Sequence, residues 1–287
     1  MPFTIRVPAS VEEALELLGE SGGDGRTVLA GGTDLLLDIE DGHATAKELV
    51  SLRRLPWNTV RWNRGGVVIG STVSLAKLDA EPRIRSELTG LWEGTHAVGG
   101  VALRHRATLG GNLGRAGPSS DIIPILLALD ARVRLVRQGG ERELPVESFI
   151  LASRKTALHP AELISAIVIP SVAPSAYLWE RVRPANDISQ VGVAVALLPT
   201  SPHWRIAVGG VLPRAQRLLP AEAVLPSPDP SEFELELAAQ SAAEHAPFAT
   251  DRRASDAYRR RLVTVLVRRA LRLVLDRHRD FGRPGAR

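Results

Sequence analysis

Val28-Leu-Ala-Gly-Gly-Thr-Asp-Leu35 is an apolar run that ends in two glycines, a hydroxyl and a carboxylate. The run predicts a buried strand over residues 27–30 that stops at a tight turn, because adjacent glycines lack Cβ atoms and let a ligand touch the backbone. Consecutive backbone N–H groups in such a turn can cradle an anion, more strongly where a helix begins. The segment is therefore either an ordinary turn or one wall of a phosphate or diphosphate site.

The residues before this segment predict a strand–helix–strand unit. Residues 3–7 are typical of a short strand, and Ser10 with Glu13 has the spacing of a capping box at a helix start. Such a unit opens α/β and α+β domains. The two glycines are not followed by Gly-Lys-Ser/Thr, and no G-x-G-x-x-G follows the strand, so neither a Walker loop nor the dinucleotide fingerprint is present.

A second glycine pair occurs in Ala107-Thr-Leu-Gly-Gly-Asn112. Thr108 and Asn112 can donate hydrogen bonds to phosphate oxygens without adding charge. Two such segments can hold a ligand with two phosphates between them. Asp121 follows at an expected helix start, where it is either a simple N-cap or an acceptor for ligand hydroxyls.

Basic side chains surround the second glycine pair. Arg104, Arg106 and Arg115 either raise the positive potential for a diphosphate or pair with acidic groups at the surface. The sequence alone leaves both interpretations open.

The rest of the chain divides at residues 170–175, which hold two prolines and two serines. Before this break the sequence predicts strands over Val67–Gly70, 132–136 and Leu163–Ile169, and helices over 74–80, 84–98 and 121–130. After it we expect strands over 189–198 and 205–211, an exposed proline-rich connection over 220–230, and helices over 232–244 and 255–277. The inner face of the last helix is predicted to consist of Tyr258, Leu262, Leu266 and Leu273.

Composition narrows the possible functions. The 287 residues include no cysteine, which excludes disulfides, a thiolate nucleophile, a cysteine zinc site and an iron–sulfur cluster held by this chain alone. The pI of about 10.0 comes from arginine, an excess that reflects either genome composition or nucleic-acid binding. No apolar run approaches the roughly 20 residues of a membrane span, and the N-terminus has no signal-peptide core, so we expect a cytoplasmic protein without a membrane span.

Together these pieces resemble one family. Ala30-Gly-Gly-Thr-Asp-Leu35, Arg104-His-Arg-Ala-Thr-Leu-Gly-Gly-Asn112 and Asp121, in this order, are similar to the FAD-binding (medium) subunit of the molybdenum hydroxylases, of xanthine dehydrogenase and aerobic carbon monoxide dehydrogenase type. The likeness extends over nearly the whole chain. Further similar stretches are Val68-Ile-Gly-Ser-Thr72, Leu158-His-Pro-Ala-Glu-Leu-Ile164, Asp187-Ile-Ser-Gln-Val191, Gly209-Gly-Val-Leu-Pro213 and Tyr258-Arg-Arg-Arg-Leu262.

The resemblance implies an α+β fold. It consists of a two-lobed, PCMH-type FAD-binding domain over residues 1–170, with lobes of about 1–55 and 56–170, and a smaller C-terminal α/β domain over 176–287. The resemblance also implies which residues bind the cofactor. These are Val28, Leu29, Ala30, Gly31, Gly32, Thr33, Asp34, Leu35, Thr108, Leu109, Gly110, Gly111, Asn112, Asp121 and Ile164. No catalytic residue and no metal ligand is assigned.

The implied activity is that of an oxidoreductase subunit. Electrons would arrive from [2Fe–2S] clusters in a small partner subunit, after substrate oxidation at a molybdenum cofactor in a large one, and would leave from FAD to an external acceptor. The assembly would be a heterotrimer, arranged as a dimer of heterotrimers. The alternatives are a stand-alone FAD-dependent oxidase or dehydrogenase of a related fold and, from the arginine-rich final helix, a basic binding module.

Overall fold

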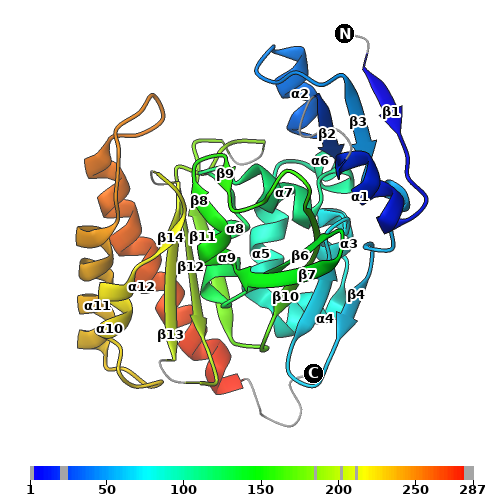
Figure 1. Cartoon of the computed structure of the whole chain (residues 1–287). Helices are drawn as coiled ribbons and strands as arrows, with labels where there is room; N and C mark the ends of the chain where they lie inside the picture. The colour runs from blue at the N-terminus through cyan, green and yellow to red at the C-terminus, as the bar shows by residue number, and fades with distance from the viewer. Residues whose placement is uncertain (1–2, 20–24, 184–185, 201–202, 211–212, 281–287) are drawn as a thin grey trace.

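The computed structural model describes residues 3–19, 25–183, 186–200, 203–210 and 213–280. The ends of the predicted domains at 1–2 and 281–287 and the end of the predicted strand 205–211 lie outside the described residues. The architecture is α+β, with separate sheets in three regions that follow one another along the chain (Figure 1).

The first lobe is built on a small parallel sheet. Its strands lie in the order β1-β3-β2. Helix α1 begins as expected, since Ser10 Oγ accepts from the Glu13 N–H at 3.1 Å. The Glu13 carboxylate, however, accepts from the N–H of Ala9 at 2.7 Å rather than from Ser10. The elements of this lobe are β1 (Thr4–Arg6), α1 (Val11–Gly19), β2 (Arg26–Leu29), α2 (Leu35–Glu40), β3 (Glu48–Ser51) and η1 (Leu52–Arg54).

The second lobe carries an antiparallel sheet in the order β4-β5-β10-β6-β7. The three strands predicted for this part of the chain are confirmed, and β4 and β7 are additional. The strands are β4 (Val60–Trp62), β5 (Val67–Gly70), β6 (Arg132–Arg137), β7 (Gly140–Pro145), β10 (Leu163–Ile169) and the separate hairpin of β8 (Ile150–Ala152) and β9 (Lys155–Thr156).

Short helices pack beside this sheet. The single helix predicted over 84–98 is wrong, because the chain breaks at Leu88, whose φ and ψ are −131° and 52°. Leu88 at the break and Leu91 after it are both fully buried. Gly90 between them has no room for a Cβ, which would lie 2.7 Å from Ile125 Cδ1. The helices are α3 (Leu75–Asp79), α4 (Pro82–Glu87), α5 (Thr89–Ala97), α6 (Val101–Arg106), α7 (Leu109–Arg115), α8 (Ile123–Ala128) and α9 (Val146–Phe149).

The C-terminal region is an antiparallel sheet between two helical layers. One face packs on α5 and α8 of the second lobe, and the other lies under α10–α12, drawn in yellow to red in Figure 1. Every residue of β12 is buried, as expected of a strand covered on both faces. The elements are β11 (Ser175–Glu180), β12 (Val191–Leu197), β13 (Trp204–Gly209), β14 (Gln216–Arg217), α10 (Leu219–Ala223), α11 (Glu232–His245) and α12 (Asp256–Asp280).

Two expectations fail in this region. The connection over 220–230 is not simply exposed, because it contains most of α10, with Ala221 and Leu225 buried. Of the predicted inner face of α12 only Leu266 is buried, whereas Tyr258 is 43% exposed. The observed inner face consists of Arg259, Val263, Leu266, Val267, Ala270, Leu271, Val274 and Leu275. This face is mostly apolar because α12 packs on β11 and β12 of the sheet and on α11.

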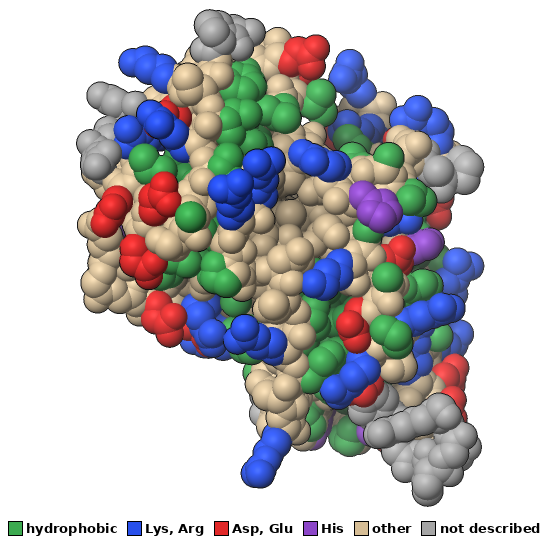
Figure 2. Space-filling model, turned by 90° about the vertical axis from the view of Figure 1, so that its right-hand side faces the viewer, with side chains coloured by type: hydrophobic (Ala, Val, Ile, Leu, Met, Phe, Trp, Pro, Cys, Tyr) green, Lys and Arg blue, Asp and Glu red, His purple; other side chains and the backbone are tan. Residues whose placement is uncertain are grey.

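Several arginines of α12 form ion pairs with acidic side chains. Arg259 pairs with Asp251, Arg268 with Glu236, and Arg272 with Glu232. On the face seen in Figure 2, Lys and Arg side chains are dispersed among acidic and hydrophobic ones. In the described part of the chain, no helix combines the length and the apolar character needed to cross a membrane.

Candidate functional site

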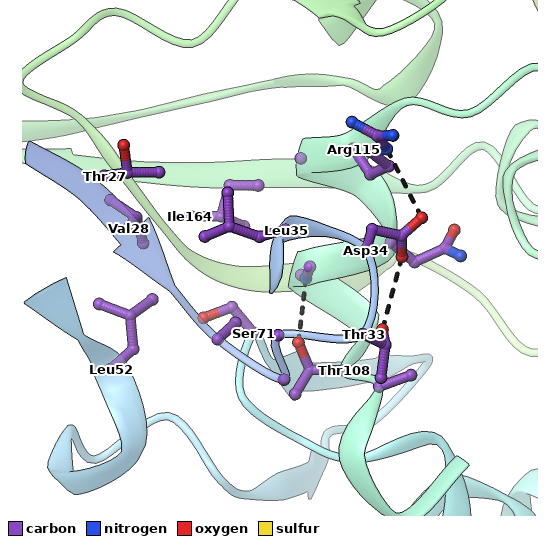
Figure 3. A pocket seen from close by; sticks show the side chains of 18 of the residues that line it. Thr27, Val28, Thr33, Asp34, Leu35, Leu52, Ser71, Thr108, Arg115 and Ile164 are labelled. Atoms are coloured by element: carbon purple, nitrogen blue, oxygen red, sulfur yellow. Dashed lines mark hydrogen bonds and ion pairs between the residues drawn. The ribbon is translucent and has the colours of Figure 1, made fainter. Parts of the chain in front are cut away.

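A cavity of about 320 Å³ lies between the two lobes, and both glycine pairs line it (Figure 3). The walls come from the loop after β2, from the start of α7 and from β10. Twelve of the fifteen residues predicted to bind a cofactor are among its lining residues, namely Val28, Ala30, Gly31, Gly32, Thr33, Asp34, Leu35, Thr108, Gly110, Gly111, Asn112 and Ile164. Segments about 75 positions apart thus meet at one place.

The first glycine pair forms the turn between β2 and α2. Gly32 has a φ of +78°, and a Cβ on Gly31 would lie 2.0 Å from the carbonyl oxygen of Arg106, so both positions require glycine. Within the described residues, the backbone N–H groups of residues 31–34 have no hydrogen-bond partner. We call residues 31–34 the donor strip. Unpaired N–H groups beside a cavity are available to an anionic ligand.

The second glycine pair differs from the expected open turn. It lies in the first turn of α7, whose N-cap is Thr108. Its N–H groups are already used: Gly110 donates to the carbonyl oxygen of Ser71 at 2.9 Å, and Gly111 donates to Thr108 Oγ1 at 3.0 Å. The prediction of two strips of bare N–H groups is therefore wrong for this segment, because the helix start and its cap satisfy them. Gly110 instead permits close packing, since a Cβ there would lie 2.5 Å from the Ser71 Cβ and 2.7 Å from the Ser71 carbonyl oxygen.

A buried hydroxyl adds a polar group that the sequence analysis did not assign to the site. Ser71 directly follows β5, is 3% exposed and lines the cavity. Its Oγ has no hydrogen-bond partner among the described residues. A buried unpaired hydroxyl is costly unless a ligand or water completes it, so this group favours a polar ligand atom nearby. The sequence signals were its place at the end of a predicted strand and within the similar stretch Val68-Ile-Gly-Ser-Thr72.

Apolar side chains form the rest of the wall. Ile164 is 7% exposed and lies on β10 next to a register shift between Ile164 and Ala166 in the pairing with β6. Such a bulge changes the direction of neighbouring side chains. The other large apolar residues of the wall are Val28, Leu35, Leu52, Val98, Leu103, Leu158 and Leu163. This part of the cavity fits a flat apolar group rather than a second charged one.

Three of the predicted residues do not line the cavity. Leu29 contacts Gly32 from below the turn, and Leu109 is fully buried in the core. Asp121 is not the N-cap of α8, which is Ile122. Its Oδ1 instead accepts from Tyr177 Oη at 2.7 Å and from Ser189 Oγ at 2.5 Å, and burial raises the pKa of this carboxyl.

The three arginines near the second glycine pair have different roles. Arg104 is buried and donates to the carbonyl oxygens of His96 and Val98. Arg115 pairs with Asp34 and Asp38. Arg106 is exposed, and its side chain has no ion pair within the described chain. Pairing with acidic or carbonyl groups is therefore the correct interpretation for Arg104 and Arg115.

Comparison with known proteins identifies the two parts of the chain. A family model described as "FAD binding domain in molybdopterin dehydrogenase" matches residues 1–172, and one described as "CO dehydrogenase flavoprotein C-terminal domain" matches residues 177–274. The carbon monoxide dehydrogenase medium chain of Hydrogenophaga pseudoflava is 29% identical over 94% of this chain and 96% of the relative. The nicotine 6-hydroxylase medium subunit of Paenarthrobacter nicotinovorans is also 29% identical, over 92% and 94%.

The fold comparison agrees. A chain in a solved structure of carbon monoxide dehydrogenase from H. pseudoflava superimposes with a TM-score of 0.89 at 28% identity, over 96% of this chain and 98% of the other. A chain of the reconstituted enzyme of Oligotropha carboxidovorans gives 0.89 at 26% identity, over 96% and 99%. The protein therefore belongs to the family of FAD-binding domains of molybdopterin dehydrogenases, and it continues into that family's flavoprotein C-terminal domain.

Proposed function

We propose that this chain is the FAD-carrying electron-transfer subunit of a heterotrimeric molybdenum hydroxylase and, as such, part of an oxidoreductase. The observation that carries the proposal is the cavity between the lobes, where a strip of unpaired backbone N–H groups faces the start of α7. A bound FAD exchanges one or two electrons and so connects one-electron iron–sulfur centres with a two-electron acceptor.

The residues of the cavity fit the parts of FAD. The donor strip would bind the diphosphate through its N–H groups, and Thr108, Asn112 and Ser71 would donate to its polar atoms. The side-chain oxygen of Asn112 already accepts from Ser120 Oγ at 2.6 Å, which leaves its amide N–H groups for the ligand. Apolar wall residues such as Leu35, Leu163 and Ile164 would contact a ring system. Leu29, Leu109 and Asp121 would act from outside the cavity by supporting these residues.

The partners follow from what the chain lacks. It has no cysteine to ligate [2Fe–2S] clusters, so these would come from a small partner subunit. By resemblance to the family, a large partner subunit would carry the molybdenum cofactor. The names of the relatives, medium chains and subunits, support a multisubunit assembly. We further propose a dimer of heterotrimers, a cytoplasmic location, an FAD-binding domain over 1–170 with lobes of about 1–55 and 56–170, and a C-terminal domain over 176–287. The family matches that end at 172 and begin at 177 support this division.

A size series at Gly114 tests the location of FAD. Gly114 lines the cavity, and a Cβ there would lie 3.6 Å from Ile164 Cδ1, an ordinary contact. Gly114→Ala should bind FAD as tightly as wild type, whereas Gly114→Leu fills the cavity and should weaken binding by at least about tenfold, or 1.4 kcal/mol. Gly140→Leu is the matched control, because nothing lies within 4 Å of a Cβ at that position. Flavin fluorescence titration measures all four chains, and equal affinities throughout would place FAD elsewhere.

The electron-transfer role is tested on the complex. Co-expression with the two partner subunits should give a yellow assembly whose flavin absorbance band is bleached on addition of the substrate of the large subunit. The isolated chain should retain FAD and should not turn over any substrate of the complex. Turnover by the isolated chain would instead indicate a stand-alone FAD-dependent oxidase or dehydrogenase.

A further inference from the structure

We propose that Arg115 is a positioning residue that holds the donor strip in place across the cavity, by bridging Asp34 and Asp38 of the first lobe. The inference rests on the proposed FAD site and deepens it. Arg115 is the last residue of α7 in the second lobe, and both aspartates belong to the turn and helix that follow β2 in the first. Figure 3 shows its side chain directed from α7 toward Asp34.

The contact with Asp38 is bidentate. The two terminal nitrogens of Arg115 lie 2.5 Å and 2.9 Å from the two carboxylate oxygens of Asp38, and its Nε lies 3.5 Å from Oδ1 of Asp34. The side chains of Arg115 and Asp38 are 24% and 14% exposed, so water screens this pair only partly. The hydrogen bond from Nη2 and the second close contact from Nη1 to the other carboxylate oxygen fix an orientation that a single exposed ion pair would not.

Backbone hydrogen bonds connect Asp38 and its helix to the donor strip. The N–H of Asp38 donates to the carbonyl oxygen of Asp34 at 2.9 Å, and the N–H of Leu36 donates to that of Gly32 at 3.1 Å. A tether on the Asp38 side chain therefore restrains the first turn of α2 and the strip before it. Among the described residues, no helix or strand of the first lobe packs broadly on one of the second. The close approach of Gly31 to the Arg106 carbonyl oxygen fixes the start of the strip, and the Arg115 bridge restrains its end and the first turn of α2.

The same contact also offsets charge. Within the described lining of the cavity, Asp34 and Asp38 are the acidic residues and Arg115 is the basic one. Without Arg115, a diphosphate bound to the strip would face two carboxylates, with Arg154 at 4.0 Å from Asp38 Oδ1 as the remaining cation paired with them among the described residues. The repulsion grows as water is excluded. Arg115 thus lets an acidic turn accept an anionic ligand through its backbone.

FAD affinity of the full chain tests this role. Arg115→Gln should weaken FAD binding by about tenfold, as expected for the loss of a partly buried bidentate pair. Asp38→Asn should also weaken it, because the tether is lost even though a negative charge is removed. The double variant should bind no more weakly than Arg115→Gln alone, and Arg115→Lys should lie between wild type and Arg115→Gln.

A control and a ligand-free measurement complete the test. Arg132→Gln removes an exposed pair with Glu143 on the distant edge of the sheet and should leave FAD affinity unchanged. In the FAD-free chain, Arg115→Gln should accelerate hydrogen exchange at the N–H groups of Asp38 and Asp41, while Arg132→Gln should not. Unchanged exchange there, or an Asp38→Asn variant that binds FAD as tightly as wild type, overturns the positioning role. A wild-type chain that binds no FAD overturns the proposed function instead.

Discussion

The two glycine pairs have the same sequence and opposite roles. Gly31-Gly32 forms a turn in which Gly32 has a left-handed φ, and the four N–H groups of residues 31–34 are unpaired within the described chain. Gly110-Gly111 starts a helix whose N–H groups bond to Ser71 and to the Thr108 hydroxyl. The first pair offers hydrogen-bond donors, and the second offers only close approach. A glycine pair therefore indicates where a backbone can come near a ligand, but not whether its N–H groups are free.

The largest expected effect comes from crowding the first pair. Gly31→Ala would place a Cβ 2.0 Å from a backbone carbonyl oxygen of the second lobe, so the lobes must separate or the turn must refold. We expect the free energy of unfolding to fall by roughly 3 kcal/mol and FAD binding to be lost. Urea unfolding followed by flavin titration measures both.

Gly140→Ala controls for this prediction, because a Cβ there meets open space. If Gly31→Ala had the same free energy of unfolding and the same FAD affinity as Gly140→Ala, the first pair would not be the tight contact between the lobes.

A smaller effect is expected at the second pair. Thr108→Val keeps the shape of the side chain but removes the oxygen that accepts from Gly111, which should cost about 1 kcal/mol of stability. FAD affinity should fall much less than in Gly31→Ala, because one side-chain donor to FAD is lost while the backbone donors of the first pair remain. Ser231→Ala, which removes the cap of α11, should cost a similar free energy with no change in FAD affinity. A Thr108→Val chain as stable as wild type would show that the cap does not hold the helix start.

The smallest effect is expected at Asp121, the acidic residue that follows the second glycine pair in the sequence. Burial raises the pKa of Asp121 above its ordinary 3.8, so the folded state disfavours the charged carboxylate. A raised carboxyl pKa means that wild type loses stability as the pH rises from about this value through the raised one. Asp121→Asn, whose amide oxygen can still accept from Tyr177 and Ser189, removes that dependence.

The difference in unfolding free energy between wild type and Asp121→Asn should therefore move in favour of the variant from pH 4 to pH 8. Chemical unfolding at several pH values measures it. A difference that is flat with pH would mean that the carboxyl is not penalised by burial.

Local sequence patterns predicted those elements whose limits do not depend on how their neighbours pack against them. Val67–Gly70 and Leu163–Ile169 are apolar runs bounded by glycine or proline, and both are strands with the expected limits. The long helices near the C-terminus were predictable for the same reason. The inner face of α12 was not, since a helix with apolar residues on more than one side is oriented by what it packs against.

The residues of the candidate site also divide into those that the sequence could indicate and those that it could not. The glycines, Thr108, Asn112 and Ile164 could be selected from motif and resemblance, and the structure brings them together at one cavity. Ser71 lies in the similar stretch Val68–Thr72 and Arg115 lies near the second glycine pair, but their roles could not be assigned in this way. A serine after a strand and an arginine near acids are common at any surface. Their significance depends on a hydroxyl without a partner and on a bridge between residues 77 positions apart.

By itself, the sequence determined the order of the motifs, the resemblance to the family and the two glycine pairs where the backbone can approach closely, because these depend on side-chain type and spacing. Only the tertiary structure decided which pair forms a turn that keeps its N–H groups free. That outcome depends on whether carbonyl and hydroxyl oxygens from elsewhere in the chain, such as those of Ser71 and Thr108, reach the turn first. Hydrogen bonds between distant segments leave no pattern in the sequence, since they are set by packing rather than by local propensity.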